Sequence, residues 1–341
     1  MNVLNPDYYN LVLLEIARLK VLGVPAVTLS IHFPLLYRPY LGENLYLLFV
    51  NFYSRLAGDL RANGLKIIVE TQVLIPDEGP AGAPLTDFYN GLTWQEHVAG
   101  RAEVADTIAQ VIRPDFLTVL SEPDTEAQVT GKHELDSVPG CSQLVYSIVR
   151  RLKQRPVPGM KIGAGAGTWH HRYRELATSF CRNTPVDYFS IHLYPVMRGV
   201  VDPVTGGIAN FPDRAIEIAD IAAFFRKTVA LGEAWPFKKR RAELGQDISP
   251  GEIFARDPFS FWARLDTLFL RMTVKLAHYK KFEFHSPFWS RYFHAYVQYD
   301  DSTKDLSPEE IDRLAFQAAR TAMINGAFTS TGTAYSSFIL P

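Results

Sequence analysis

The sequence predicts an α/β fold, a TIM-type (β/α)8 barrel formed by residues 1–341 as a single domain. Helical and strand patterns alternate along the whole chain, and polar residues gather where the strands end. No linker rich in Pro, Gly or Ser divides the 341 residues, of which 47% are apolar, so a large buried core is expected. An open doubly wound sheet is the alternative fold, and the number of repeated units favours the barrel.

One helix-to-strand unit illustrates the pattern. Apolar residues at helical spacing predict a helix over residues 44–63, and Gly64 follows where the end of a helix favours a left-handed residue. Residues 65–69 are short and rich in β-branched side chains, as expected of a buried parallel strand. Strands joined in this way through helices pair in parallel.

The same unit recurs, and it gives seven strands and eight helices. The predicted strands are 24–31, 65–69, 115–120, 160–163, 186–191, 228–231 and 281–284. The predicted helices are 7–22, 44–63, 93–112, 142–153, 173–181, 212–226, 258–280 and 308–325, and the seventh should pack Phe261, Leu265, Leu268 and Met272 against the barrel. An eight-stranded barrel needs one more strand before the first helix. It lies upstream of this chain, is a stub at residues 1–4, or is replaced by the tail at 327–339.

Composition narrows the classes of partner. The formal net charge of -1 gives no reason to expect a nucleic-acid partner, and no apolar run is long enough to cross a bilayer. Cys141 and Cys181 lack the spacing of a metal knuckle, and they either form a disulfide or remain thiols. Residues 1–10 show no signal-peptide pattern, so a cytoplasmic location is expected unless a trimmed leader directs secretion or periplasmic export. The oligomeric state is left open.

Carboxylate, imidazole and aromatic side chains follow the predicted strands. In a barrel these strand ends share one rim, and enzymes with this fold have their active sites there. Aromatic rings stack on the apolar faces of sugars, and carboxylates and imidazoles bond the hydroxyls, so a carbohydrate site without metal or cofactor is predicted. The residues expected at the rim are His32, Glu70, Gln72, Glu122, Trp169, His170, His192, Tyr194, Glu233, Trp235, His285 and Trp289.

Three short motifs resemble the clan A retaining glycoside hydrolases. They are Ser121-Glu-Pro, Ser190-Ile-His-Leu-Tyr-Pro and Gly232-Glu-Ala-Trp-Pro, in that order along the chain. The resemblance implies a barrel that cleaves β-glycosidic bonds of a poly- or oligosaccharide. It implies that Glu122 is the acid/base after strand four and Glu233 the nucleophile after strand seven, if one strand is missing at the start. Tyr194 would bond the nucleophile.

The first motif departs from the clan pattern. Ser121 stands where the clan usually has the Asn that bonds the sugar 2-hydroxyl, so Ser121 is expected to bind substrate in its place. A serine offers one hydroxyl instead of an amide. A barrel that binds carbohydrate without cleaving it is therefore the second functional hypothesis, and a barrel enzyme of unrelated chemistry is the third.

Glycoside cleavage sets requirements on the two carboxyl groups. One must be protonated and the other ionised, and in retaining enzymes they lie about 5–5.5 Å apart. We expect hydrogen bonds, including one from Tyr194, to keep Glu233 ionised. We expect nearby negative charge and partial burial to raise the pKa of Glu122. Glu70 is the rival carboxylate because it also ends a strand.

Other motifs have simpler interpretations. The Gly163-Ala-Gly-Ala-Gly run lacks the spacing of a dinucleotide loop, so it predicts a close approach of backbone instead. Adjacent His170 and His171 share no helical spacing with a carboxylate, which argues against a metal site. The basic run at residues 238–241 predicts a solvated face, with attraction of an acidic sugar as the alternative.

Overall fold

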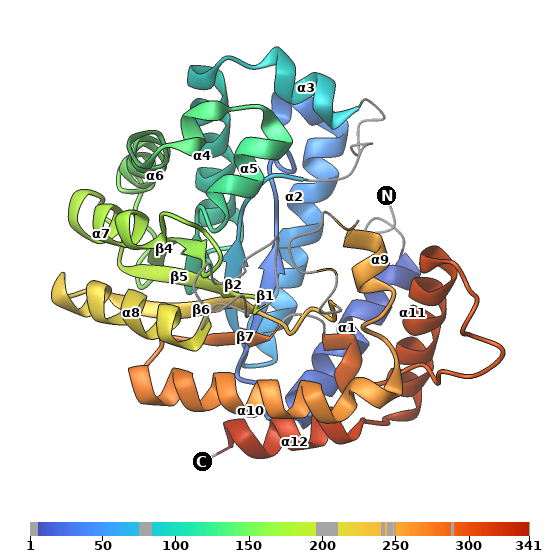
Figure 1. Ribbon diagram of the computed structural model, residues 1–341. Helices are drawn as coiled ribbons and strands as arrows, with labels where there is room; N and C mark the ends of the chain where they lie inside the picture. The colour runs from blue at the N-terminus through green and yellow to red at the C-terminus, as the bar shows by residue number, and fades with distance from the viewer. Residues whose placement is uncertain are drawn as a thin grey trace.

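Seven parallel strands form one sheet in the order of the chain (Figure 1). The structure is a computed structural model that describes residues 6–74, 84–195, 211–239, 243, 248, 250–287 and 290–340. Thr28 Oγ1 of the first strand lies 2.9 Å from Ser286 Oγ of the last strand, so the sheet is nearly closed. The predicted barrel fold is therefore confirmed. The strands are β1 (Ala26–Ser30), β2 (Lys66–Glu70), β3 (Phe116–Thr118), β4 (Lys161–Gly167), β5 (Tyr188–Leu193), β6 (Thr228–Ala234) and β7 (His285–Pro287).

Helices surround this sheet (Figure 1). The long ones are α1 (Pro6–Val21), α2 (Arg38–Ala62), α4 (Trp94–Val111), α6 (Val138–Leu152), α7 (Tyr173–Asn183), α8 (Phe211–Phe224), α10 (Ala263–Lys280), α11 (Pro308–Asn325) and α12 (Ser330–Ile339). Short helices α3 (Leu85–Gly91), α5 (Pro123–Thr130) and α9 (Pro250–Phe254) lie in the connections, as do the 3-10 turns η2 (His133–Asp136), η4 (Ser260–Trp262) and η5 (Ser290–Phe293). The eight predicted helices are all present, whereas α12 and the short helices were not predicted.

Local signals in the sequence fix several helix ends. Gly64 has a φ of +74° after α2, as its position predicts. Thr93 and Glu96 form a capping box at the start of α4, since each satisfies a backbone N–H of the other. The predicted strand at 281–284 is wrong by a few residues. Lys281 takes a left-handed conformation (φ 53°) to end α10. Strand β7 begins at His285, although the backbone of Glu283 and Phe284 already forms hydrogen bonds with β6.

The tail of the chain does not supply an eighth strand. Residues Ser330–Ile339 form helix α12, which packs through Tyr335 against Leu270 and Val274 of α10. A cavity of about 770 Å³ lies where the sheet is open, lined by β1, β7 and parts of α1, α10 and α12. The prediction of which α10 residues face the barrel was also wrong. Leu265 and Leu268 are exposed, whereas Leu270 and Val274 of the same helix are buried.

The glycine run of β4 allows close packing inside the barrel. A Cβ atom on Gly163 would lie 2.1 Å from the ring of Tyr188, and one on Gly165 would lie 1.6 Å from the carbonyl oxygen of Ser190. These glycines therefore serve contact with β5, as the sequence predicted. The Tyr188 hydroxyl then reaches Thr118 Oγ1 at 2.8 Å, which satisfies both groups in the barrel interior.

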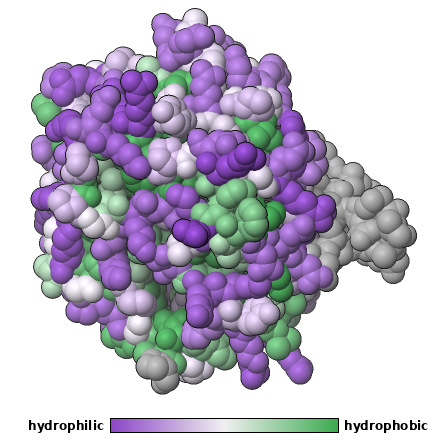
Figure 2. All heavy atoms as spheres, turned by 90° about the vertical axis from the view of Figure 1, so that its left-hand side faces the viewer, coloured by the Kyte–Doolittle hydropathy of each residue, from purple (hydrophilic) through white to green (hydrophobic). Residues whose placement is uncertain are grey.

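The outer surface over α6, α7 and α8 is largely hydrophilic, with scattered apolar side chains (Figure 2). The inner faces of α6 and α7 carry Cys141 and Cys181, which are both buried free thiols, so the disulfide alternative is not realised. None of the helices within the described ranges has the length and hydropathy needed to span a membrane.

Candidate active site

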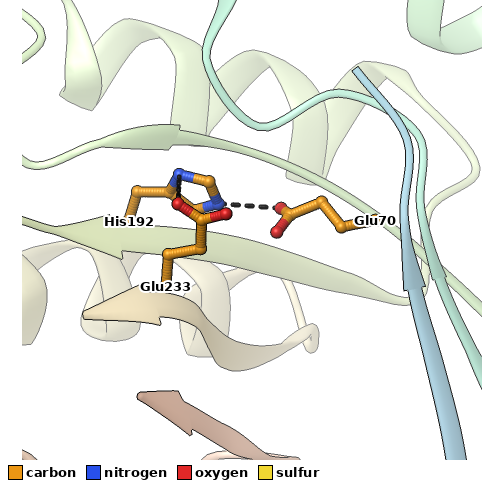
Figure 3. A group of neighbouring side chains, drawn as sticks. All are labelled: Glu70, His192 and Glu233. Atoms are coloured by element: carbon orange, nitrogen blue, oxygen red, sulfur yellow. Dashed lines mark hydrogen bonds and ion pairs between the residues drawn. The ribbon is translucent and has the colours of Figure 1, made fainter. Parts of the chain in front are cut away.

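The ends of β2, β5 and β6 bring three ionisable side chains together (Figure 3). Glu70 ends β2, His192 lies in β5 and Glu233 lies in β6. The pairing of β5 with β6 shifts between Ile191 and His192, and this irregular step places His192 opposite Glu233. Gly232 leaves room for the cluster, because a Cβ atom there would lie 3.3 Å from Glu70 Oε1 and 3.3 Å from His192 Cδ2.

The His192 ring is held between carboxylates. Its Nε2 lies 2.7 Å from Glu70 Oε1, and its Nδ1 lies 2.8 Å from Glu122 Oε1. The same Nδ1 lies 3.6 Å from Glu233 Oε2. Glu122 follows β3 and directly precedes α5, so the two glutamates expected to be catalytic do converge on one imidazole.

Neutral donors complete the cluster. The Tyr194 hydroxyl donates to Glu233 Oε2, as the sequence predicted. Thr125, in the first turn of α5, donates from its Oγ1 to Glu122 Oε2 over 2.7 Å. Ser121 is fully buried and accepts a hydrogen bond of 2.7 Å from Gln72 Nε2. Its hydroxyl thus contacts the Gln72 amide, beside the acid/base candidate.

Burial and charge within the cluster shift the pKa values of His192, Glu70 and Tyr194 in different directions. Burial lowers the pKa of His192, but Glu70 and Glu233 outweigh burial and raise it well above 6.5. Burial raises the pKa of Glu70, but the His192 charge and hydrogen bond outweigh it, so the Glu70 pKa is lowered. Burial raises the pKa of Tyr194 well above 10, with a further contribution from Glu233, and Tyr194 stays a donor.

Glu233 differs from the expectation drawn from its motif. Burial raises its pKa to about 8, and the charges of Glu70 and Glu122 add to the rise. His192 and the Tyr194 hydrogen bond oppose this shift without cancelling it. The expectation that Glu233 stays ionised in the free site is therefore wrong. The physical reason is that three carboxylates share one buried space with a single imidazole, and the site retains a proton at neutral pH.

Three aromatic residues pack together beside Glu233. Trp169 stacks on Tyr194 with ring centroids 5.2 Å apart, and Phe237 packs against Tyr194 at 4.7 Å. The indole nitrogen of Trp169 donates to Asp124 Oδ2 at 2.9 Å. These contacts fix the Tyr194 ring, so its hydroxyl is held toward the carboxylate.

Trp235 occupies a different position from the one predicted for sugar stacking. It is 1% exposed, stacks on Tyr292 at 5.1 Å and donates from Nε1 to Asp257 Oδ2 at 2.8 Å. Lys238 Nζ lies 4.2 Å from the Trp235 ring centroid and forms ion pairs with Asp257 and Asp266. Trp235 therefore supports the loop after β6, and Lys238 is buried rather than solvated.

The remaining predicted residues lie around the cluster or away from it. His32 Nδ1 accepts from the backbone N–H of Gln72 at 3.1 Å, and burial lowers the pKa of His32 to about 4. His170 stacks on His171 and accepts from the backbone N–H of Arg172, which are local contacts.

His285 and Trp289 come from the last strand and the segment after it. His285 faces the helices, with Nε2 2.9 Å from Thr273 Oγ1, and burial lowers its pKa to about 3. Trp289 lies outside the described residues.

The same side chains include a possible set of metal ligands. One ligand atom each from Glu70, His192 and Glu233 lies within 4.8 Å of the others. Both ring nitrogens of His192 already face carboxylate oxygens at hydrogen-bond distance. A metal bound there would have to displace one of these contacts, so the arrangement fits a protonated imidazole better.

Comparison with known proteins places the fold. No protein-family model matches this chain, and no curated protein sequence matches it. A β-glucosidase from Thermotoga maritima, solved with glucoimidazole, is 13% identical, with 97% of this chain and 86% of that chain covered and a TM-score of 0.56. The β-glycosidase BGL167 is 14% identical, with 92% and 87% covered and a TM-score of 0.51.

A mannosidase gives a similar result. The exo-β-1,4-mannosidase Op5Man5 from Opitutaceae bacterium strain TAV5 is 13% identical, with 98% of this chain and 55% of that chain covered and a TM-score of 0.59. At these identities the likeness concerns the fold alone. This chain has the barrel fold of those glycoside hydrolases, and the resemblance inferred from its motifs is confirmed at that level.

Proposed function

We propose that this protein is a retaining β-glycoside hydrolase in which Glu122 is the acid/base and Glu233 the nucleophile. The observation that carries this proposal is that both carboxylates face one nitrogen of His192, at 2.8 and 3.6 Å. The two oxygens that face this nitrogen are therefore at most about 6.4 Å apart, and this closeness supports a retaining pair, whose carboxyl groups lie about 5–5.5 Å apart.

The chemistry uses two displacements. In the first, Glu233 attacks the anomeric carbon while Glu122 gives its proton to the leaving oxygen. Glu122 is then a carboxylate and takes a proton from the water that attacks the same carbon, which releases Glu233. The pair must hold one proton at the start. The raised pKa of Glu233 means that the buried site holds a proton at neutral pH, and this proton must lie on Glu122 when Glu233 attacks.

The surroundings support a carbohydrate substrate. Trp169 and Tyr194 place largely buried aromatic rings next to Glu233, and neutral His32 and Gln72 provide polar groups at neighbouring strand ends. Three of the matched structures are named as a β-glucosidase, a β-glycosidase and an exo-β-1,4-mannosidase. We therefore propose a β-linked oligo- or polysaccharide as the substrate class.

The test uses aryl β-glucosides, β-mannosides and β-galactosides with sodium azide. Glu233→Ala should lose nearly all turnover, and azide should restore some of it with an α-glycosyl azide as product. Glu122→Ala should keep activity only on substrates with good leaving groups, and azide should give the β-glycosyl azide. The two variants are expected to yield opposite anomers because azide replaces the nucleophile in one and the water in the other.

The control is Glu309→Ala, which removes an exposed glutamate of α11 and should leave all rates unchanged. Full activity of Glu233→Ala would contradict the assignment. Binding of oligosaccharides by the unaltered protein without cleavage of any substrate would support the carbohydrate-binding hypothesis instead. Turnover that depends on added metal and is lost with chelator would support unrelated chemistry at the same residues.

A further inference from the structure

Glu70 is a third carboxylate that the two-carboxylate mechanism does not use. It is 1% exposed at the end of β2, so a sugar cannot reach it without rearrangement. Its Oε1 lies 2.7 Å from His192 Nε2, and a hydrogen bond from Ser121 also contributes to lowering its pKa. Burying an ionised carboxylate costs free energy unless a partner compensates it. His192 is that partner.

The two carboxylates on the ring define its protonation. A neutral imidazole has one N–H donor and one acceptor nitrogen, and its acceptor would face a carboxylate lone pair in this arrangement. His192 has Glu70 at one nitrogen and Glu122 at the other, both at hydrogen-bond distance. The ring is therefore protonated on both nitrogens when both partners are ionised.

The groups around His192 come from several elements. Glu70 of β2, Glu122 before α5 and Glu233 of β6 are the carboxyl groups that face the ring, and Tyr194 donates a neutral hydroxyl to Glu233. His32 after β1 is neutral because burial lowers its pKa to about 4.

One further charged pair lies close by. The charge of Arg101 in α4 contributes to lowering the pKa of His32. Arg101 is itself paired with buried Glu126 of α5, with Arg101 Nε 3.0 Å from Glu126 Oε1. His192 is thus the cation on which the proton count of the three carboxylates depends.

We propose that Glu70 is a positioning residue that holds a proton on His192 and, through the hydrogen bond from His192 to Glu122, keeps the catalytic pair supplied with its working proton. This inference rests on the proposed function. The Glu70–His192 pair would set the pH range over which the site is active. Glu70 acts through His192 and does not touch the substrate.

The proton transfer balances. The Nδ1 proton of the imidazolium moves 2.8 Å across to Glu122 Oε1, which turns an imidazolium and a carboxylate into a neutral imidazole and a carboxylic acid. Glu122 then protonates the leaving oxygen. In the second step, Glu122 takes a proton from the attacking water and returns it to Nδ1. Glu70 remains ionised throughout and accepts the Nε2 proton as a hydrogen bond.

The variant Glu70→Gln removes the charge and keeps the shape. Loss of a negative charge at hydrogen-bond distance lowers the proton affinity of its neighbours, by about one to three pKa units. The high-pH limb of kcat/KM for an aryl β-glycoside should move to lower pH by at least about one unit. KM should change little, since the side chain of Glu70 is buried beneath the site.

A matched control separates this role from general damage to the core. Glu126→Gln changes a carboxylate that is also fully buried and also hydrogen-bonded to a histidine, His97, at 2.8 Å. It should alter stability and leave the limbs of the pH profile where they are. If Glu70→Gln lowers activity equally at all pH values with the limbs unmoved, Glu70 is only structural and the proposal is overturned.

A second measurement needs no turnover. The ¹⁵N signals of the His192 ring in the unaltered protein should be those of an imidazolium up to at least about pH 8, and they should titrate at lower pH in Glu70→Gln. A neutral ring at pH 7 in the unaltered protein would refute the role of Glu70 even if the protein is a hydrolase. Absence of hydrolase activity with an imidazolium at His192 would refute the proposed function alone. If Glu70→Gln does not fold, the signals of the unaltered protein decide.

Discussion

Tyr194→Phe is the most informative single change, because it removes one hydroxyl and keeps the packing. The hydroxyl donates to Glu233 Oε2, whereas the ring is held by Trp169 on one side and Phe237 on another. The substitution should therefore leave the fold intact and deprive the Glu233 carboxylate of its neutral donor.

The size of the effect follows from the hydrogen bond. A hydrogen bond to a charged group contributes about 1.5–3 kcal/mol, which corresponds to about one to two pKa units. The pKa of Glu233, already raised to about 8, should rise further. More of the shared proton then sits on Glu233 instead of on Glu122 or His192, so kcat/KM at the optimum should fall by about 10- to 100-fold.

The assay is the pH dependence of kcat/KM on the best aryl β-glycoside. The high-pH limb should move upward in Tyr194→Phe, the opposite of the shift expected for Glu70→Gln. Tyr188→Phe is the control, since it removes another buried hydroxyl, the partner of Thr118. The reasoning is refuted if Tyr194→Phe stays within about twofold of the unaltered protein with the limb unmoved.

Two further predictions concern stability. Gly165→Ala places a Cβ atom 1.6 Å from the Ser190 carbonyl oxygen, so the free energy of unfolding measured in urea should fall by at least about 3 kcal/mol. Gly58→Ala has nothing within 4 Å and should not lower it, so equal urea midpoints for the two variants would contradict this prediction. His285 has a folded pKa of about 3, below that of an unfolded histidine, so its contribution is present above about pH 6.5 and is lost as pH falls toward 3. Replacing it with Phe should flatten the pH dependence of stability over that range by about 1.4 kcal/mol per pH unit, and parallel curves for the two proteins would disprove the account.

Much of the fold followed from local patterns. The helix at Pro308–Asn325 has a serine cap, a proline at its start and a glycine after its end, and its predicted bounds agree with the structure. The facing of α10 could not be predicted in the same way. It has apolar residues on more than one side, and only the positions of α8, α12 and the sheet decide that Leu270 is buried and Leu268 exposed.

The site was predictable where strand ends carry it. Glu70, Glu122, His192, Tyr194 and Glu233 all follow or end strands, and parallel topology brings such positions to one rim. The proton balance was not predictable, because it depends on how deeply three carboxylates are buried around one ring.

Some roles of residues near the site were not predicted, and these residues differ in whether the sequence carried a signal for them. The Glu122-Pro123 pair marks a helix start, so Thr125 one turn later had a signal that was overlooked. Lys238 was instead predicted to be solvated. Its burial had no local signal, since its partners Asp257 and Asp266 lie far away in the chain. Conversely, His285 ends a strand pattern but points toward α10 and α12.

The central claim is that Glu233 forms the covalent bond and Glu122 handles the proton. The most direct test is to incubate the protein with activated 2-deoxy-2-fluoro β-glycosides, whose intermediates hydrolyse slowly, and to locate the added sugar by peptide mass spectrometry. The account predicts one sugar on the peptide that contains Glu233, with simultaneous loss of activity. A sugar on Glu70 or Glu122, or substrate turnover that yields the inverted anomer without any adduct, would contradict it.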